Sequence, residues 1–156
     1  MPLGVGDRAP DFTLDGSPRA SYRVSEMIGT PLVLAFYPED HSPVCSIQLR
    51  AYSDGMADFS RLGAMVWGVS PQDPQVHSDF AEKYGINFPL LSDGDKAVAK
   101  AYEVLGPLGF YRRSIFVIDR FGIISYCHRT TAGLTYKPTS ALLEAIQEAE
   151  AKSSGR

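Results

Sequence analysis

The chain has 156 residues, of which 44% are hydrophobic and 21% are charged. Its length and composition predict a single domain, residues 1–156, that buries its own core without disulfides or a structural metal. The formal net charge of -3 gives no electrostatic reason to expect nucleic acid or an anionic membrane as a partner. No run approaches the roughly 18 apolar residues that a membrane-spanning helix needs.

The cysteine content and the first residues favour a cytoplasmic protein. The two cysteines are too few for a disulfide framework, which suits a reducing compartment. The opening MPLGVGDRAPDFTL has no basic region followed by an apolar stretch, so we expect no secretory signal.

The first half of the chain predicts two strands and a helix. Residues 11–15 (DFTLD) alternate apolar and polar positions like a short edge strand, and residues 31–37 (PLVLAFY) form a continuous apolar run typical of a strand covered on both faces. A helix is expected to begin at Pro43 and to bend at Gly55. Its inward face is predicted to hold Cys45, Leu49, Tyr52, Met56 and Phe59.

The second half continues the alternation of strands and helices and ends with a hairpin and a helix. This order predicts an α/β fold, with a central mixed sheet flanked by helices. The expected elements are a strand at 64–70, a helix at 74–85, an extended piece at 86–93, a helix at 95–106, hairpin strands at 112–119 and 122–130, and a helix at 138–152.

Cys45 stands where a buried strand ends and a helix begins. In α/β sheets ligands gather at such carboxyl ends. Helix N-termini favour the thiolate and can lower a cysteine pKa from about 8.5 to roughly 3.5–7.5, and a nearby arginine stabilises the anion further. Because charged and turn-forming residues precede Cys45, we expect a thiol that solvent and substrates reach.

Two motifs resemble the peroxiredoxin (AhpC/TSA) family. Pro38, Ser42 and Cys45 form P-x-x-x-S-x-x-C after the buried strand, and RRSIFVID is similar to the family's arginine-bearing strand. In that strand an arginine stands three residues before the aromatic, which selects Arg113 and not Arg112. VGDRAPDFTL, VSPQ and FPLLSD extend the resemblance over nearly the whole chain. The chain looks most like the bacterioferritin-comigratory and one-cysteine branches.

The resemblance implies a thioredoxin-like fold and a thiol peroxidase that reduces hydrogen peroxide and organic hydroperoxides. Cys45 would attack the peroxide, while Ser42 and Arg113 would bind it and stabilise the developing charge. Pro38 would exclude water, and Gln48, where the family often has glutamate, could orient Arg113. Metal, flavin and haem are not expected, and the resemblance suggests dimers.

The resemblance leaves the second thiol open. Many relatives carry a resolving cysteine five residues after the peroxidatic one, and that position is Arg50 here. We expect an external thiol, which could be thioredoxin, glutaredoxin or a low-molecular-weight thiol. Cys127 shares a strand face with Ile123 and Ser125, which favours a packing role. The alternative is an atypical two-cysteine enzyme in which Cys127 resolves the Cys45 sulfenic acid.

Other functions remain as alternatives. A thiol–disulfide oxidoreductase usually needs C-x-x-C, and Gln48 occupies the second cysteine position. A glutathione-peroxidase-like enzyme could use Trp67 and Gln72, but its surrounding motifs are absent. A non-catalytic redox sensor or holdase would use Cys45 as a switch. Unlike a sensor, a catalyst turns over many peroxides when reductant is present.

The histidines give no metal-site pattern. Cys45 and Cys127 with His41 and His128 lack the paired spacing of zinc sites, so we expect no metal. His77 likewise shows no partner in the sequence, and His41 fits a solvated loop.

Overall fold

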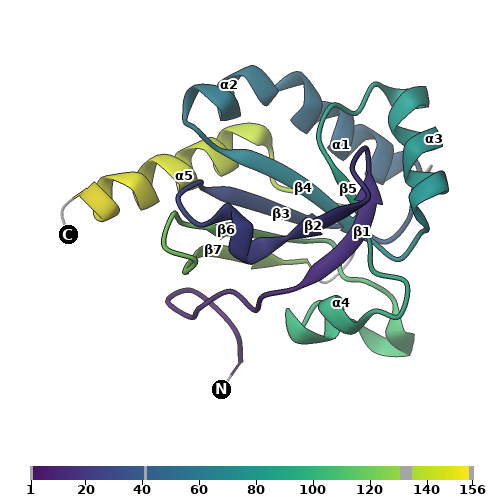
Figure 1. The fold of residues 1–156 in the computed structure, drawn as a ribbon, viewed down its shortest axis with the longest axis horizontal. Coiled ribbons are helices and arrows are strands. Elements are labelled where there is room, and N and C mark those ends of the chain that lie inside the picture. The colour runs from purple at the N-terminus through teal and green to yellow at the C-terminus, as the bar shows by residue number, and fades with distance from the viewer. Residues whose placement is uncertain (1, 41, 131–134, 155–156) are drawn as a thin grey trace.

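A computed structural model of the chain describes residues 2–40, 42–130 and 135–154. In this part of the chain the strands are β1 Thr13–Ser17, β2 Ser21–Arg23, β3 Leu32–Phe36, β4 Met65–Ser70, β5 Leu90–Ser92, β6 Ser114–Ile118 and β7 Ile124–Arg129. They form one mixed sheet in the order β2-β1-β5-β4-β3-β6-β7 (Figure 1). The predicted α/β class with a central mixed sheet is confirmed.

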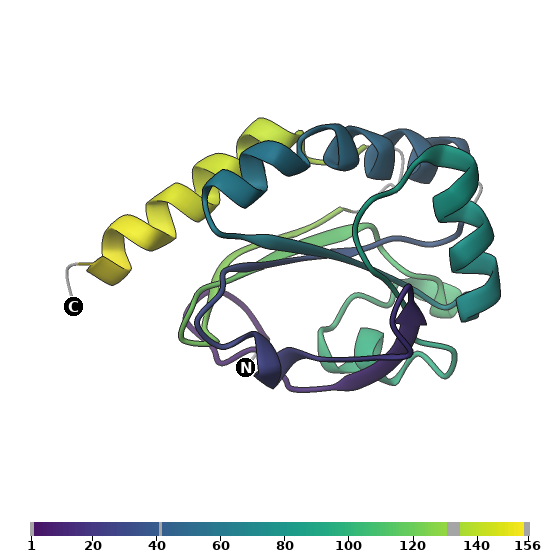
Figure 2. The ribbon, with the colours of Figure 1, turned by 45° about the horizontal axis from the view of Figure 1, so that its top comes forward.

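Helices cover both faces of this sheet. Within the described residues they are α1 Pro43–Asp54, α2 Met56–Arg61, α3 Pro74–Tyr84, α4 Ala97–Ala101 and α5 Thr139–Ser154, with short 3-10 turns at Val24–Met27 and Pro107–Gly109. Figure 2 shows α1, α2 and α5 together on one side of the sheet, while α4 lies on the other. We call these sides the α1 face and the α4 face.

The central strand β3 supplies side chains to both faces. Every residue of β3 is buried, and β3 pairs in parallel with β4 and antiparallel with β6. Alternate side chains of a strand point to opposite faces. Val33 and Ala35 accordingly pack in the core of the α1 face, and Leu34 and Phe36 pack in the core of the α4 face. The continuous apolar run thus predicted the doubly covered strand.

The helix that follows β3 begins and breaks where the sequence predicts. Pro43 occupies its first turn, and Ser42 is its N-cap. Gly55 separates α1 from α2, which confirms the expected interruption. A Cβ at Gly55 would lie 2.6 Å from the Thr139 methyl carbon at the start of α5. The glycine therefore allows α5 to pack closely against the junction.

Two predicted elements differ from the structure. Residues 11–15 were expected to form an edge strand, but β1 pairs with both β2 and β5. Its partner β2 has three residues, too few to show a sequence pattern. The helix expected at 95–106 is only α4, because the backbone at Glu103 takes a positive φ of 59°, which interrupts helical geometry.

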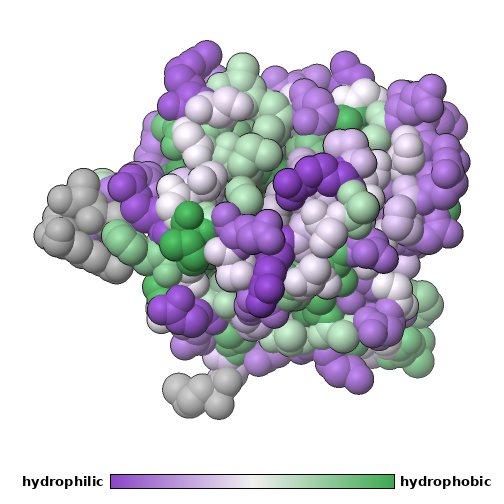
Figure 3. Space-filling view, viewed as in Figure 1, coloured by the Kyte–Doolittle hydropathy of each residue, from purple (hydrophilic) through white to green (hydrophobic). Residues whose placement is uncertain are grey.

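The surface of the molecule is hydrophilic over α3 (Figure 3). Figure 3 shows hydrophilic side chains gathered at the right-hand edge of the molecule, over α3. No helix in the described part of the chain has both the length and the apolar character needed to cross a bilayer.

Candidate active site

Cys45 lies in the first turn of α1, after the loop that follows β3. Its side chain has 0% relative exposure and belongs to the core of the α1 face. The expectation of a solvent-reached thiol is therefore wrong for this structure. The reason is visible in the helix itself, because Cys45, Leu49 and Tyr52 share the buried stripe of α1. The sulfur thus sits in a place from which bulk water is excluded.

Ser42 caps the helix that carries the thiol. Its Oγ accepts a hydrogen bond from the backbone N–H of Cys45 at 3.4 Å, and its carbonyl oxygen accepts one from the Ser46 hydroxyl at 2.8 Å. Pro38, half-buried, follows β3 at the other end of the same loop. The loop between β3 and α1 therefore places Ser42 next to Cys45 in space as well as in sequence.

Arg113 brings a buried positive charge to the sulfur. Its Nη1 donates to Cys45 Sγ at 3.1 Å and to Gln48 Oε1 at 2.6 Å, and the residue is only 3% exposed. The neighbouring Arg112 points elsewhere, donating from Nε to the Thr130 carbonyl at 3.0 Å. Of the two adjacent arginines, Arg113 is the one at the thiol, because it directly precedes β6 on the α1 face.

A chain of hydrogen bonds leads away from Arg113. While Gln48 Oε1 accepts from the guanidinium, its Nε2 donates to the Tyr52 hydroxyl at 3.2 Å. Tyr52 in turn donates to the Lys137 carbonyl oxygen at 2.6 Å. Burial raises the pKa of Tyr52, so its hydroxyl keeps the proton that it donates. Gln48, on the same helix as Cys45, thus accepts from the guanidinium nitrogen that also donates to the sulfur, and it helps to hold that nitrogen in place.

Comparisons with known proteins agree with this geometry. The family model of the AhpC/TSA family matches residues 5–127. The chain belongs to this family. A peroxiredoxin bcp of Helicobacter pylori is 34% identical over 132 residues, which cover 80% of this chain and 87% of that protein. As a member of the bcp branch, the chain is a peroxiredoxin and a thiol peroxidase of the oxidoreductase class.

Solved structures show the same relationship. Peroxidoxin BcpB from Mycobacterium tuberculosis superposes with a TM-score of 0.83 at 26% identity, covering 94% of this chain and 97% of that one. The bacterioferritin comigratory protein of Xanthomonas campestris, described with an alkyl peroxide reduction activity, gives a TM-score of 0.79 at 27% identity, covering 88% and 90% of the two chains. The thioredoxin-like fold is confirmed.

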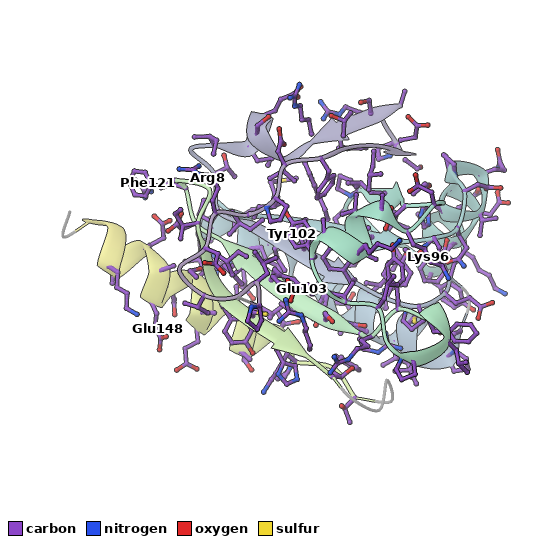
Figure 4. The ribbon with its side chains drawn as sticks, turned by 90° about the horizontal axis from the view of Figure 1, so that it is seen from below. Arg8, Lys96, Tyr102, Glu103, Phe121 and Glu148 are labelled. Carbon is purple, nitrogen blue, oxygen red and sulfur yellow. The ribbon has the colours of Figure 1, made fainter. Side chains whose placement is uncertain are left out.

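The second cysteine of this peroxiredoxin lies on the other face of the sheet. Cys127 is opposite Phe116 in the β6–β7 register and packs against the core of the α4 face. Tyr102, a member of that core, lies near the centre of the view in Figure 4. Because a disulfide needs Cα atoms within about 7 Å and converging side chains, a Cys45–Cys127 bond would require the sheet to rearrange.

The surroundings of Cys127 also make its thiol less reactive than that of a solvent-exposed cysteine. Burial raises its pKa, Arg129 lowers it in part, and Glu103 raises it again. A protonated thiol in mid-strand is a poor nucleophile at neutral pH. Its placement fits the packing role better than the resolving one.

The helper residues considered for a glutathione-peroxidase-like site do not assemble around Cys45. Trp67 packs on the α4 face, where its ring lies 5.4 Å from that of Tyr22. Gln72 Oε1 accepts from the backbone of Asp40 and from the Ser70 hydroxyl. Neither side chain is therefore placed to serve the thiol.

The residues considered for a metal site do not form a cluster in the described part of the chain. His41 lies outside the described residues, and His128, opposite Ile115 in β7, is on a different face from Cys127. Within the described ranges there is no group of three potential metal ligands.

Sequence reasoning missed a buried polar network next to the site. His77, for which no partner was expected, contacts Asp40 with Nδ1 at 2.6 Å, and Asp40 also accepts from the Tyr37 hydroxyl at 2.6 Å. One signal was available. His77, Phe80 and Tyr84 recur at helical spacing, which puts the histidine on the inward stripe of α3 and so requires a buried partner.

Proposed function

We propose that this peroxiredoxin reduces hydrogen peroxide and organic hydroperoxides at Cys45 and is returned to the thiol by an external reductant. The observation that carries this proposal is the 3.1 Å contact between Arg113 Nη1 and Cys45 Sγ at the start of α1. A fixed guanidinium and a helix N-terminus both favour a sulfur anion. Both groups are therefore placed to stabilise negative charge on Cys45 when it reacts.

In the first step the thiolate attacks one peroxide oxygen. An S–O bond forms, the O–O bond breaks, and the other oxygen leaves as hydroxide or alkoxide and takes up a proton to become water or an alcohol. Cys45 is oxidised to a sulfenic acid while the peroxide is reduced. Both the attacking sulfur and the leaving oxygen carry negative charge, so the step is accelerated by positive and hydrogen-bond-donating groups already in place.

The surrounding residues are assigned to that step by their positions. Arg113 stabilises the thiolate and then the charge on the departing oxygen. The Ser42 oxygen accepts from the Cys45 backbone, so its own O–H can be donated to a peroxide oxygen. Pro38 closes the loop without offering a backbone N–H, and Gln48 holds Arg113 in orientation through the 2.6 Å contact.

In the second step an external thiol attacks the sulfenic sulfur, which gives a mixed disulfide and releases water. A second thiol then displaces Cys45 and restores it. The side chain at position 50 supports the need for an outside thiol, because Arg50 there is exposed and pairs with Asp54 at 3.0 Å. Cys127, across the sheet, supports it as well. Thioredoxin, glutaredoxin or a low-molecular-weight thiol could each serve.

Further features of the proposal rest on the family resemblance and the composition. A homodimer, a cytoplasmic location and a role in antioxidant defence and cell redox homeostasis are predicted from family resemblance and cysteine content. The net charge of -3 supports neither nucleic acid nor an anionic membrane as a partner. Organic hydroperoxides as substrates are supported by the alkyl peroxide reduction described for the Xanthomonas campestris relative.

The proposal is tested by steady-state peroxide consumption. Hydrogen peroxide or an alkyl hydroperoxide is supplied with each reductant in turn, and the moles of peroxide consumed per mole of protein are measured. We expect many turnovers with at least one reductant, no turnover for Cys45→Ser, and unchanged turnover for Cys127→Ser. A single oxidation per chain with every reductant would contradict catalysis and favour a redox sensor.

A further inference from the structure

A buried polar network lies beside the loop that joins β3 to α1. Asp40, in that loop, accepts from the Tyr37 hydroxyl at 2.6 Å and contacts His77 Nδ1 at 2.6 Å. Its backbone N–H donates to Gln72 Oε1 at 2.9 Å. The side chains of Asp40 and His77 have no exposed surface. The network therefore joins the loop to α3 and to the segment that follows β4.

The partners of His77 determine where its protons lie. Its Nε2 is 2.9 Å from the Leu91 carbonyl oxygen, which can only accept, so Nε2 carries a hydrogen. Its Nδ1 faces the Asp40 carboxyl group, and one proton must lie between these two groups, whichever formally holds it. The pair consequently has no net charge, although it is completely buried.

Stability alone does not explain such a pair. Removing two polar groups from water is costly, and well-packed apolar side chains would hold α3 on the sheet equally well. The neighbourhood is already apolar and aromatic, with the Phe80 ring 6.4 Å from that of Tyr37. Hydrogen bonds differ from apolar packing in being directional. Directional hydrogen bonds can therefore fix the position of the loop, which apolar packing would leave less defined.

Pro38 and Ser42 both belong to the candidate peroxide site, and they are the two ends of one loop segment. Asp40 is two residues from each, and two residues of chain span at most about 7 Å, so a displacement of Asp40 moves both ends. We propose that the Asp40–His77 pair is a positioning device that holds Pro38 and Ser42 at Cys45 for peroxide binding. This inference rests on the proposed peroxidase function.

Two reactions of Cys45, oxidation by peroxide and alkylation by iodoacetamide, should respond differently to loss of the pair. Attack on a peroxide needs the aligned loop, and a misplacement of about 1 Å can cost on the order of 10²-fold in rate. Alkylation by iodoacetamide needs no aligned loop, only a thiolate and access to the sulfur, which has no exposed surface in the folded protein. Loss of the pair should therefore slow oxidation by peroxide and leave alkylation unchanged or faster, because a displaced loop can only increase access, whereas general destabilisation would change both rates in the same direction.

The test uses protein carrying Cys127→Ser, so that Cys45 is its only thiol. Second-order rate constants of Cys45 with hydrogen peroxide and with iodoacetamide are measured by intact mass for Asp40→Leu and Asp40→Asn. Asp40→Leu removes the hydrogen bonds, and we expect its peroxide rate to fall by about 10²-fold while its alkylation rate stays unchanged or rises. In Asp40→Asn the amide can accept from Tyr37 and donate to His77, so we expect most of the peroxide rate to be retained.

A matched control weakens α3 without touching the loop. Asp73 caps α3 by accepting from the Val76 N–H at 2.9 Å, so Asp73→Ala should lower thermal stability and leave the peroxide rate unchanged. The positioning role is overturned if Asp40→Leu leaves the peroxide rate unchanged, if both rates change equally, or if Asp40→Asn is as slow as Asp40→Leu. A wild-type protein that peroxide does not oxidise would instead contradict the proposed function.

A second pair of variants covers the case in which Asp40→Leu does not fold. The amide of His77→Asn lies near the position of Nδ1 and can bond Asp40, whereas that of His77→Gln lies near Nε2 and can bond Leu91. We expect the peroxide rate of His77→Asn to exceed that of His77→Gln, with similar alkylation rates. Equal peroxide rates in the two variants would overturn the proposal.

Discussion

The two cysteines occupy opposite faces of one sheet and differ in almost every feature that governs thiol chemistry. Cys45 begins a helix and has a guanidinium 3.1 Å from its sulfur. Cys127 is in mid-strand on the α4 face, where burial raises its pKa. Each cysteine has an arginine on its own face of the sheet. Arg113 lies beside Cys45, and Arg129 packs over the Phe116 ring on the face of Cys127. An arginine nearby is therefore not sufficient, since its donors must reach the sulfur.

The difference between the two arginines lies in what they bond. Arg113 donates to the thiol and to Gln48, whereas Arg129 donates to the carbonyl oxygens of Leu3 and Tyr102. The first serves a reactive group, and the second ties the N-terminal segment and the end of α4 to the sheet. The comparison predicts that changes on the α1 face alter chemistry and that changes on the α4 face alter stability.

The largest expected effect comes from Cys45→Ser. This change removes the nucleophile and should reduce peroxide consumption to the uncatalysed rate, because a serine hydroxyl stays protonated next to an arginine. Peroxide consumption in the presence of the best reductant is the measurement. Circular dichroism provides the control that the fold is retained. Residual turnover above the uncatalysed rate would assign the nucleophile elsewhere.

Arg113→Met is expected to have the next largest effect. It removes the charge at the sulfur, and loss of one such donor typically costs about 10²–10³-fold in rate. The rate of Cys45 oxidation by hydrogen peroxide is measured for this variant and for Arg129→Met. Arg129→Met should lower the melting temperature and leave the oxidation rate unchanged. Equal rate losses in the two variants would remove the distinction between the two faces.

The position of Arg113 was predictable from the family resemblance, which places an arginine three residues before the aromatic of this strand and so selects Arg113 and not Arg112. Because side chains alternate between faces in a strand, Arg113 then lies on the face of Ile115 and Val117. The Ser42 cap was predictable because Ser42 directly precedes the first helical residue. The alternation of strands and helices likewise predicted the mixed sheet and the strand at β3.

Contacts between distant segments were not predictable. Asp40 and His77 are 37 positions apart, and nothing in either local pattern names the other. The burial of Cys45 depends on α1 lying against the sheet and α5, and the interior place of β1 depends on the short β2. A single sequence shows that His77 lies on the inward face of a helix, but it does not show which side chain packs against that face.

Gln48 offers a smaller effect on the α1 face. Gln48→Met removes one hydrogen bond to a charged group, worth about 1.5 kcal/mol or more, so we expect roughly a tenfold slower oxidation of Cys45. Gln48→Glu should also slow oxidation, because its carboxylate competes with the thiolate for Arg113. If Cys45 is oxidised faster in Gln48→Glu than in the wild type, an uncharged side chain at position 48 is not needed to stabilise the thiolate.

The smallest effect is expected for Cys127. Because its pKa in the folded protein is raised by burial, its thiolate fraction at any pH near neutrality is lower than that of a solvent-exposed cysteine. In Cys45→Ser protein, alkylation of Cys127 should therefore rise with pH along a curve displaced to higher pH than that of a free thiol. Unfolding in denaturant should remove the displacement. A curve at or below the free-thiol position would show that the α4 face does not suppress this thiol.

The account is tested most directly by adding one equivalent of hydrogen peroxide to the fully reduced protein and locating the oxidation by peptide mass spectrometry after trapping with dimedone. We predict a sulfenic acid on Cys45, an unmodified thiol at Cys127, and no disulfide between them. A reduced Cys45, or a Cys45–Cys127 disulfide, would contradict it.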